Sequence, residues 1–560
     1  MAGSTLLIQD LFEREDPRFL GELYASDAEK KLKAFGARWA ADARPFARAA
    51  LLAYIADGCD RPHHRPLVKK LFKELEGKGD DEAMGAFMVA FDRLVKRKLV
   101  EGVRYSPATR SYEPRTRLVQ VEDDDDNEDN DEDRFSTRTR RYLKRRAWRY
   151  FRVLGHRDPE RYGHAIREAL ARYEDPDVAT PAAFLDAWGL VHALYHGSPV
   201  LDRRPRGVVV TEGASLADLA PAPIYPEAWQ DEPDAVLSLA LHARSRPVRV
   251  FAIGLLKRDY AAQLARLPAK GLVMVVRSQH DEVAAFGAEL LPKAPGLDAL
   301  LVGDWLMLLE AKSEAALDLV CSLVAERVRV DRVTLDQAVD LACARPTRVA
   351  ELGLRWVQEK PADGDAGLAS LSRLVRAENA RARAEGVRYY VAKIEATPGA
   401  NAQRVRDLFD AKGAEVRAEA AALVTRSPRF RDDTALWGAL AESPWADARA
   451  FLLKHLGERQ KALLADERRH LWASTLLAVS RGSRDKRLAL SQISDRIAQK
   501  PAEAEALLPL LAIALRSVRE TERRAALAAV ARAAFRAPAL KDALERAVPE
   551  LSLAAVGAAE

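Results

Sequence analysis

The chain has 560 residues, with 88 Lys and Arg against 83 Asp and Glu, three Cys and a net charge of +5. Because 48% of the residues are hydrophobic and 31% are charged, the composition excludes a disordered or fibrous chain and indicates a sizeable core. Three cysteines are too few for a disulfide framework. The first residues lack the features of a secretory signal, and the longest apolar run is ten residues. We therefore expect a cytoplasmic protein.

Residues 1 to about 98 are predicted to form helices, because their apolar residues recur at spacings of three and four. The segments concerned are 6–15, 27–42, 45–58, 65–77 and 81–99. Asp80 and Asp81 precede or open the last of them and are candidate N-caps. This part of the chain is therefore expected to be a helical domain.

Two changes of character follow this helical part. Residues 99–121 carry β-branched and aromatic residues around a turn-forming cluster, which predicts a β-hairpin. Residues 122–133 (EDDDDNEDNDED) hold ten acidic residues in twelve, and removing these ten would leave the rest of the chain at +15. Such a run is typical of a solvated loop. A second hypothesis is that the acidic run binds the arginine side chains of the basic helix that follows, and that a partner displaces the run.

A basic helix is predicted directly after the acidic run. Its stripe of arginines recurs at steps of three or four residues and is formed by Arg138, Arg141, Arg145, Arg149 and Arg152. Further cations flank the stripe, namely Arg140, Lys144 and Arg146. An apolar stripe lies opposite and is formed by Leu143, Ala147, Tyr150, Phe151 and Leu154. Guanidinium groups at this density can bind phosphates or a carboxylate-rich surface. Three interpretations stay open: a solvated amphipathic helix, contact with an acidic protein or with the acidic run, and nucleic-acid binding.

The middle of the chain continues with helices broken at residues 155–159, a helical segment over 181–197 and a stretch rich in Pro and Gly over 198–229. That stretch contains one β-like run at residues 208–212. Its many prolines predict a surface crossing that ends a domain.

From about residue 234 a helical pattern repeats. The frame Val-x-x-Phe-x-x-x-Leu begins at Val248, Val283, Ala316 and Val349, in steps of 35, 33 and 33 residues, and the copy at Ala316 places Leu319 at its centre. Further copies begin at Val416, which is 67 residues beyond Val349, and at Ala448. A second helical segment precedes most copies. Because neither helix can bury its apolar stripe alone, such units must stack as an α-solenoid.

These helix-turn-helix units resemble HEAT-type repeats over roughly residues 234–560, although their period is shorter than usual. The resemblance implies a scaffold that binds protein or nucleic acid, and it brings no catalytic residues with it. Residues 1–233 resemble no family that we can name. The expected domains are an N-terminal helical domain with a terminal hairpin (1–121), an acidic linker (122–137), a basic helical middle domain (138–233) and the solenoid (234–560).

Two histidine arrangements could bind a metal. His192 and His196 lie four residues apart on a predicted helix, but the Glu that zinc peptidases require after the first His is missing. The alternative is that both imidazoles pack near the aromatic residues Trp188 and Tyr195. Cys59, His63 and His64 form a second group without a further pair at ligand spacing. We predict no metal at either place.

Motifs for nucleophilic catalysis, nucleotide binding and redox chemistry are missing from the sequence. The tryptophans of the repeats are expected to pack between helices; they are Trp305, Trp356, Trp437, Trp445 and Trp472. We therefore expect an all-α protein that is not an enzyme. We expect it to bind no cofactor, metal ion, small-molecule substrate or membrane. Its expected partner is a protein, bound on the solenoid surface within a bacterial multi-protein assembly. The alternative is a nucleic-acid-binding protein that uses the basic helix, gated by residues 122–133.

Overall fold

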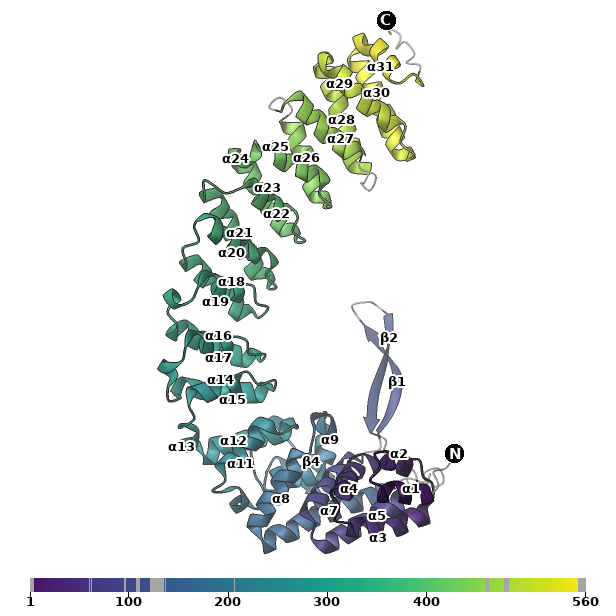
Figure 1. Ribbon diagram of the computed structural model, residues 1–560, viewed down its shortest axis with the longest axis vertical. Helices are drawn as coiled ribbons and strands as arrows, with labels where there is room; N and C mark the ends of the chain where they lie inside the picture. The colour runs from purple at the N-terminus through teal and green to yellow at the C-terminus, as the bar shows by residue number, and fades with distance from the viewer. Residues whose placement is uncertain are drawn as a thin grey trace. The chain divides into compact units, whose positions relative to one another are not determined.

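The structure is a computed structural model that describes residues 5–59, 61, 63–94, 97–106, 111–120, 135, 137–205, 207–459, 463–477 and 483–551. The described residues are mainly helical with small antiparallel β elements, which confirms the expected all-α class with a small hairpin (Figure 1). By its internal contacts the chain divides into two compact units, Met1–Val320 and Cys321–Glu560. The division falls inside helix α17 (Glu314–Arg327).

The first unit begins with a helical bundle around an aromatic core. Its helices are α1 (Thr5–Glu13), α2 (Phe19–Tyr24), α3 (Glu29–Ala41), α4 (Pro45–Gly58), α5 (Arg65–Lys78) and α6 (Asp81–Arg93). The ring of Phe12 lies 5.0 Å from that of Phe35, and the ring of Phe19 lies 5.3 Å from that of Trp39. The buried Trp39 indole donates a hydrogen bond to the Ala47 carbonyl at 3.0 Å. Large rings with a satisfied polar atom thus hold these helices together.

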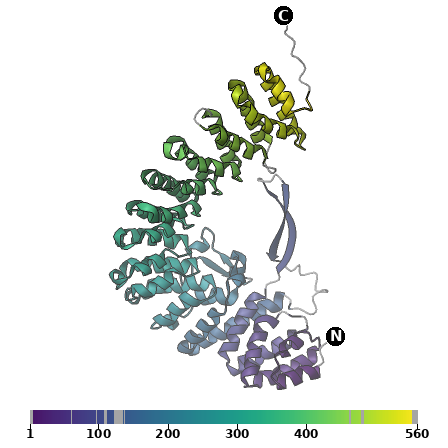
Figure 2. The same ribbon diagram turned by 45° about the horizontal axis from the view of Figure 1, so that its top comes forward.

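The predicted hairpin follows α6 and is confirmed. Strand β1 (Arg97–Ser106) pairs antiparallel with β2 (Ser111–Gln120) (Figures 1 and 2). In this pairing Arg97 lies opposite Gln120. The helix predicted over residues 81–99 is too long, because α6 ends at Arg93 and the chain enters strand pairing four residues later. The cap at Asp80 is correct: its side chain accepts a hydrogen bond from the Ala83 amide at 3.0 Å.

Helices α7, α8 and α10 pack onto α6, and α9 packs against α10. Their bounds are α7 (Thr137–Arg157), α8 (Pro159–Ala171), α9 (Pro181–Asp186) and α10 (Trp188–Tyr195). Short strands β3 (Leu201–Arg204) and β4 (Gly207–Val210) pair next, and single 3₁₀ turns cover Asp175–Val178, Leu216–Asp218 and Pro226–Trp229. The buried Asp92 carboxylate of α6 accepts hydrogen bonds from the Tyr173 hydroxyl at 2.7 Å and the Gly189 amide at 2.9 Å. One carboxylate therefore ties the beginning of α10 to α6.

Paired helices begin at Pro233 in the first unit. The elements are α11 (Pro233–His242), α12 (Arg246–Asp259), α13 (Ala261–Leu264), α14 (Ala269–Val276), α15 (Asp281–Leu290), α16 (Val302–Leu308), and the 3₁₀ turns Leu291–Lys293 and Leu297–Ala299. A continuous set of buried residues extends from Ile8 to Phe286. The helical bundle and the first helix pairs thus share one hydrophobic core.

Helix pairs continue through the second unit. The helices are α18 (Leu335–Ala342), α19 (Thr347–Glu359), α20 (Gly364–Leu371), α21 (Ala380–Ala396), α22 (Ala402–Phe409), α23 (Ala414–Arg426), α24 (Pro428–Arg431), α25 (Thr434–Glu442), α26 (Ala446–Glu458), α27 (Ala465–Leu477), α28 (Ser483–Gln499), α29 (Ala504–Leu515), α30 (Glu520–Arg536) and α31 (Lys541–Ala547). Single 3₁₀ turns cover Val330–Arg332, Ser372–Arg376, Pro501–Glu503 and Pro538–Leu540. From α19 onward, the second helix of each pair contacts the second helix of the next. Stacking of neighbouring pairs therefore builds this unit (Figure 1).

The interval of 67 residues between Val349 and Val416, about two periods of the repeat, contains a further pair, α20 and α21, whose second helix buries Gly386 and Tyr390. One detail of the repeat frame differs from the prediction. Leu319, predicted at the centre of its copy, is 47% exposed, whereas Ala316 of the same copy is buried. The buried stripe of α17 thus lies one position away from the predicted one at this point.

Arginines link successive pairs. Arg417, near the beginning of α23, donates a hydrogen bond back to the Ala411 carbonyl at 2.6 Å and forward to Asp447 of α26 at 2.8 Å. The same double contact recurs in Arg249 with Ala243 and Glu282, in Arg383 with Ala377 and Glu415, and in Arg449 with Ser443 and Asp485. Because the guanidinium group offers donors in a fixed fork, one side chain satisfies the turn carbonyl and pairs with the next repeat.

Candidate anion-binding face of helix α7

Helix α7 separates apolar and basic side chains cleanly. Its inward side consists of buried residues that pack against α6, α8 and α10: Leu143, Ala147, Trp148, Phe151 and Leu154. The predicted arginine stripe lies on the opposite side. We call the stripe the α7 basic face; it consists of Arg138, Arg141, Arg145, Arg149 and Arg152. These arginines span about 21 Å of helix at 1.5 Å per residue.

Four arginines of the α7 basic face are exposed: Arg138, Arg141, Arg149 and Arg152. Within the part of the chain that the structure describes, no carboxylate forms an ion pair with any of the four. Arg145 is half-buried, and its guanidinium group lies over the Trp188 ring at 4.7 Å and donates to the Pro205 carbonyl. The face therefore offers four solvated guanidinium groups and one that is fixed by packing.

The cations that flank the α7 basic face have a different role. Lys144 is buried and forms an ion pair with Asp186 at 2.6 Å, which joins α7 to the end of α9. Arg146 donates to Glu76 of α5 at 3.0 Å. Because Lys144 and Arg146 already have carboxylate partners, they hold α7 in place.

Exposed apolar side chains border the basic face. Tyr142 is 53% exposed and Val153 is 43% exposed, and helical geometry places both on the same edge of the arginine stripe. Large apolar side chains beside charges are common in surfaces that contact proteins. Helix α7 therefore exposes charged and apolar side chains next to one another, as protein-binding surfaces do.

His192 and His196 lie next to the α7 basic face. The His192 ring stacks on Trp188 with centroids 4.1 Å apart, its Nδ1 donates to the Trp188 carbonyl at 2.9 Å, and the His196 ring is 5.4 Å away. The pKa of both imidazoles is lowered to about 4, first by burial; His196 contributes next for His192, and the Arg203 and Arg152 guanidinium groups contribute for both rings. Both rings are thus neutral near neutral pH and belong to an aromatic stack.

Cys59, His63 and His64 do not converge on one point in the structure. His64 is fully buried, with Nδ1 2.9 Å from the Tyr54 hydroxyl oxygen, and the Cys59 thiol donates to the Ile55 carbonyl at 3.2 Å. His63 lies 3.7 Å from a Glu29 carboxylate oxygen instead. Among the described residues there is no group of three or more His, Cys, Asp or Glu side chains that could hold a metal ion.

The tryptophans of the repeats pack as expected. Four of the five are buried, namely Trp305, Trp356, Trp437 and Trp472. Trp445 is half-buried beneath the Arg417 guanidinium group, which lies 4.3 Å from the ring centroid. This ring therefore packs on an arginine that links two helix pairs.

The acidic run 122–133 lies outside the described residues, so its contacts are not part of the site. Trp188 was expected only as a packing neighbour of His192, and its contact with Arg145 was missed. The partners Asp186 and Glu76 were missed as well. Asp186 lies 42 residues from Lys144, and Glu76 lies 70 residues from Arg146. Pairs so far apart in the sequence leave no local pattern from which the contact could be predicted. Only the amphipathic period of α7 was readable in the sequence.

Neither a protein-family model nor a curated protein matches this sequence. In the part of the chain that the structure describes, no helix is both long and apolar enough to cross a membrane.

Proposed function

We propose that the chain is a non-catalytic scaffold that binds an acidic protein partner, with the α7 basic face as the charged part of its binding surface. The observation that carries this proposal is the set of four exposed arginines that have no carboxylate partner among the described residues, on a helix where Lys144 and Arg146 are paired with carboxylates. Guanidinium groups left in water keep their capacity for bidentate contacts to carboxylates.

The stacked helix pairs support the scaffold part of the proposal. Stacked pairs of this kind form extended surfaces that bind partners through many shallow contacts. The HEAT-type resemblance belongs to the same proposal, because HEAT-type proteins are scaffolds that bind protein or nucleic acid. A cytoplasmic location and membership of a bacterial multi-protein assembly are proposed with it.

Nucleic-acid binding is the second candidate function. It is favoured by the spacing of the arginines, since five guanidinium groups in about 21 Å of helix can follow a row of phosphates. We rank it second because of the exposed Tyr142 and Val153 at the edge of the face. Apolar area next to charge suits a protein surface better than a phosphate backbone.

Co-purification from cells that contain the native chain tests whether the partner is an acidic protein or a nucleic acid. The wild-type chain is compared with the variant R138Q/R141Q/R149Q/R152Q, with and without nuclease treatment, and the co-purified material is identified by mass spectrometry. The proposal expects one acidic protein that survives nuclease and is lost in the four-arginine variant. Loss of all bound material after nuclease would favour nucleic acid instead, and equal recovery with both chains would contradict a role for the face.

A further inference from the structure

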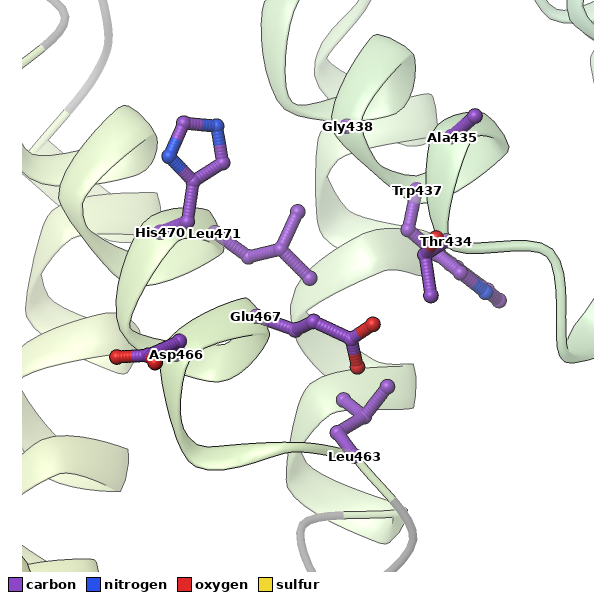
Figure 3. A pocket seen from close by; sticks show the side chains of 9 residues that line it. All are labelled: Thr434, Ala435, Trp437, Gly438, Leu463, Asp466, Glu467, His470 and Leu471. Atoms are coloured by element: carbon purple, nitrogen blue, oxygen red, sulfur yellow. The ribbon is translucent and has the colours of Figure 1, made fainter.

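The second unit contains a groove that lies between α25 and α27 (Figure 3). Its volume is about 450 Å³, which lies within the range of ligand sites. The residues that line it are Thr434, Ala435, Trp437, Gly438, Leu463, Asp466, Glu467, His470 and Leu471. This groove lies in a different unit from the α7 basic face.

The apolar part of the groove lies at Leu471, Ala435 and Gly438. Leu471 points into the space between the two helices, whereas the Trp437 side chain points away from Leu471 and Glu467 (Figure 3). The buried Trp437 ring is stacked on His455, with centroids 3.7 Å apart. Gly438 leaves the space open, because a Cβ added there would meet nothing within 4 Å. An aliphatic chain placed on this apolar part of the groove would therefore be shielded from water.

One carboxylate faces the groove. Glu467 also points into it, whereas Asp466 projects away and pairs with Arg469 at 3.6 Å (Figure 3). Glu467 Oε2 accepts a hydrogen bond from the Leu464 amide at 3.1 Å, which holds the carboxylate in position. No base in the described part of the chain forms an ion pair with Glu467. An apolar floor with one unpaired carboxylate complements a long side chain that ends in a cation.

We propose that this groove binds a Lys or Arg side chain of a protein partner, with the aliphatic stem on Leu471 and the cation at Glu467. The proposal rests on the scaffold function. It adds a second binding site, which prefers a cation, whereas the α7 basic face prefers an anion. A partner that uses both would carry an acidic surface and, separately, a basic residue.

Saturation-transfer NMR with n-butylguanidinium, which has the stem and the head group of Arg, tests the groove directly. We expect transfer to the butyl protons in the wild-type chain and weaker transfer to 1-pentanol, which lacks the charge. The variant Glu467→Gln keeps an acceptor for the Leu464 amide and removes the charge. It should lower the affinity for n-butylguanidinium up to about fivefold, as expected for a solvent-accessible ion pair.

Gly438→Leu provides a second variant that fills the groove with a side chain. Since a Cβ there meets no atom and glycine is a poor helix former, this variant should fold at least as stably as the wild type and lose most of the binding. Glu442→Gln, which removes an exposed charge elsewhere on α25, is the matched control and should bind normally. Thermal unfolding confirms the fold of each variant.

Undiminished binding in Gly438→Leu or Glu467→Gln would overturn the proposal, and so would equal affinity for 1-pentanol and n-butylguanidinium. The outcome is separable from that of the scaffold proposal, because the α7 basic face is intact in all three variants. Loss of polyanion binding on mutation of α7 tests the scaffold function without reference to the groove.

Discussion

At the scale of single residues, buried histidines couple the fold to pH. His64 is fully buried against Tyr54, and its pKa is lowered to about 4, first by burial and then by the Arg61 guanidinium group. In the unfolded chain the ordinary pKa of about 6.5 returns. Between these values the unfolded chain binds a proton that the folded chain does not. The contribution of His64 to stability is therefore complete above pH 6.5 and is lost as pH falls toward 4.

The variant His64→Gln should reduce this pH dependence. Between about pH 7 and pH 5 the wild-type chain should lose roughly 2 kcal/mol more of its free energy of unfolding than the variant, at 1.36 kcal/mol per pKa unit. Urea unfolding followed by circular dichroism measures the difference. The other buried histidines contribute equally to both chains. Identical pH dependence in the two chains would show that His64 is protonated without penalty in the fold.

At the scale of elements, the arginines that link helix pairs are structural, whereas the four exposed arginines of the α7 basic face are not. Arg417 is buried and connects α23 to α26 through Asp447, while Arg355 on α19 is exposed. Charge alone does not distinguish the two kinds of arginine. The distinction comes from the acid that the next repeat places opposite the guanidinium group.

Replacing Arg417 by Met should lower the free energy of unfolding of the second unit by about 2 kcal/mol, because the Ala411 carbonyl and Asp447 both lose their donor. Replacing the exposed Arg355 by Met should change it by less than about 0.5 kcal/mol. A double-mutant cycle with Asp447→Ala isolates the pair. A coupling energy near zero would contradict the linking role of this arginine.

The sequence predicted elements better than contacts. The period of α7 placed Leu143 and Phe151 inside and Arg149 outside, because amphipathic helices expose their charged side. It could not place Arg145 over Trp188, since that contact depends on how α7 and α10 pack. The buried positions of α21 were hard to recognise for a similar reason: Gly386 is buried where an added Cβ would lie 3.3 Å from the Leu374 side chain, a contact between elements.

At the scale of the whole molecule, charge is unevenly distributed along the chain. The ten acidic residues of the run 122–133 precede α7 in the sequence, and they are tethered to a helix rich in arginine. A tethered acidic segment competes with any acidic partner at a high effective concentration. The HEAT-type class and the domain boundaries near residues 121, 137 and 233 stay predictions.

Deletion of residues 122–133 should therefore strengthen binding of a polyanion and steepen its loss with salt. Heparin-affinity chromatography with a salt gradient measures both chains under the same conditions. Elution of the deletion variant at the same salt concentration as the full chain would remove the idea that the acidic run competes for the α7 basic face.

The most direct measurement of the central claim is the binding of a fluorescent polyglutamate peptide of about 20 residues, followed by anisotropy between about 50 and 200 mM salt. Three chains are compared: the wild type, R138Q/R141Q/R149Q/R152Q, and a control, R355Q/R388Q/R523Q/R546Q, which loses four exposed arginines elsewhere. We predict that the wild type and the control bind with the same salt dependence and that the α7 variant loses binding. Equal weakening in the α7 variant and the control would show that net charge, and not the α7 basic face, binds the acidic peptide, and would contradict the account.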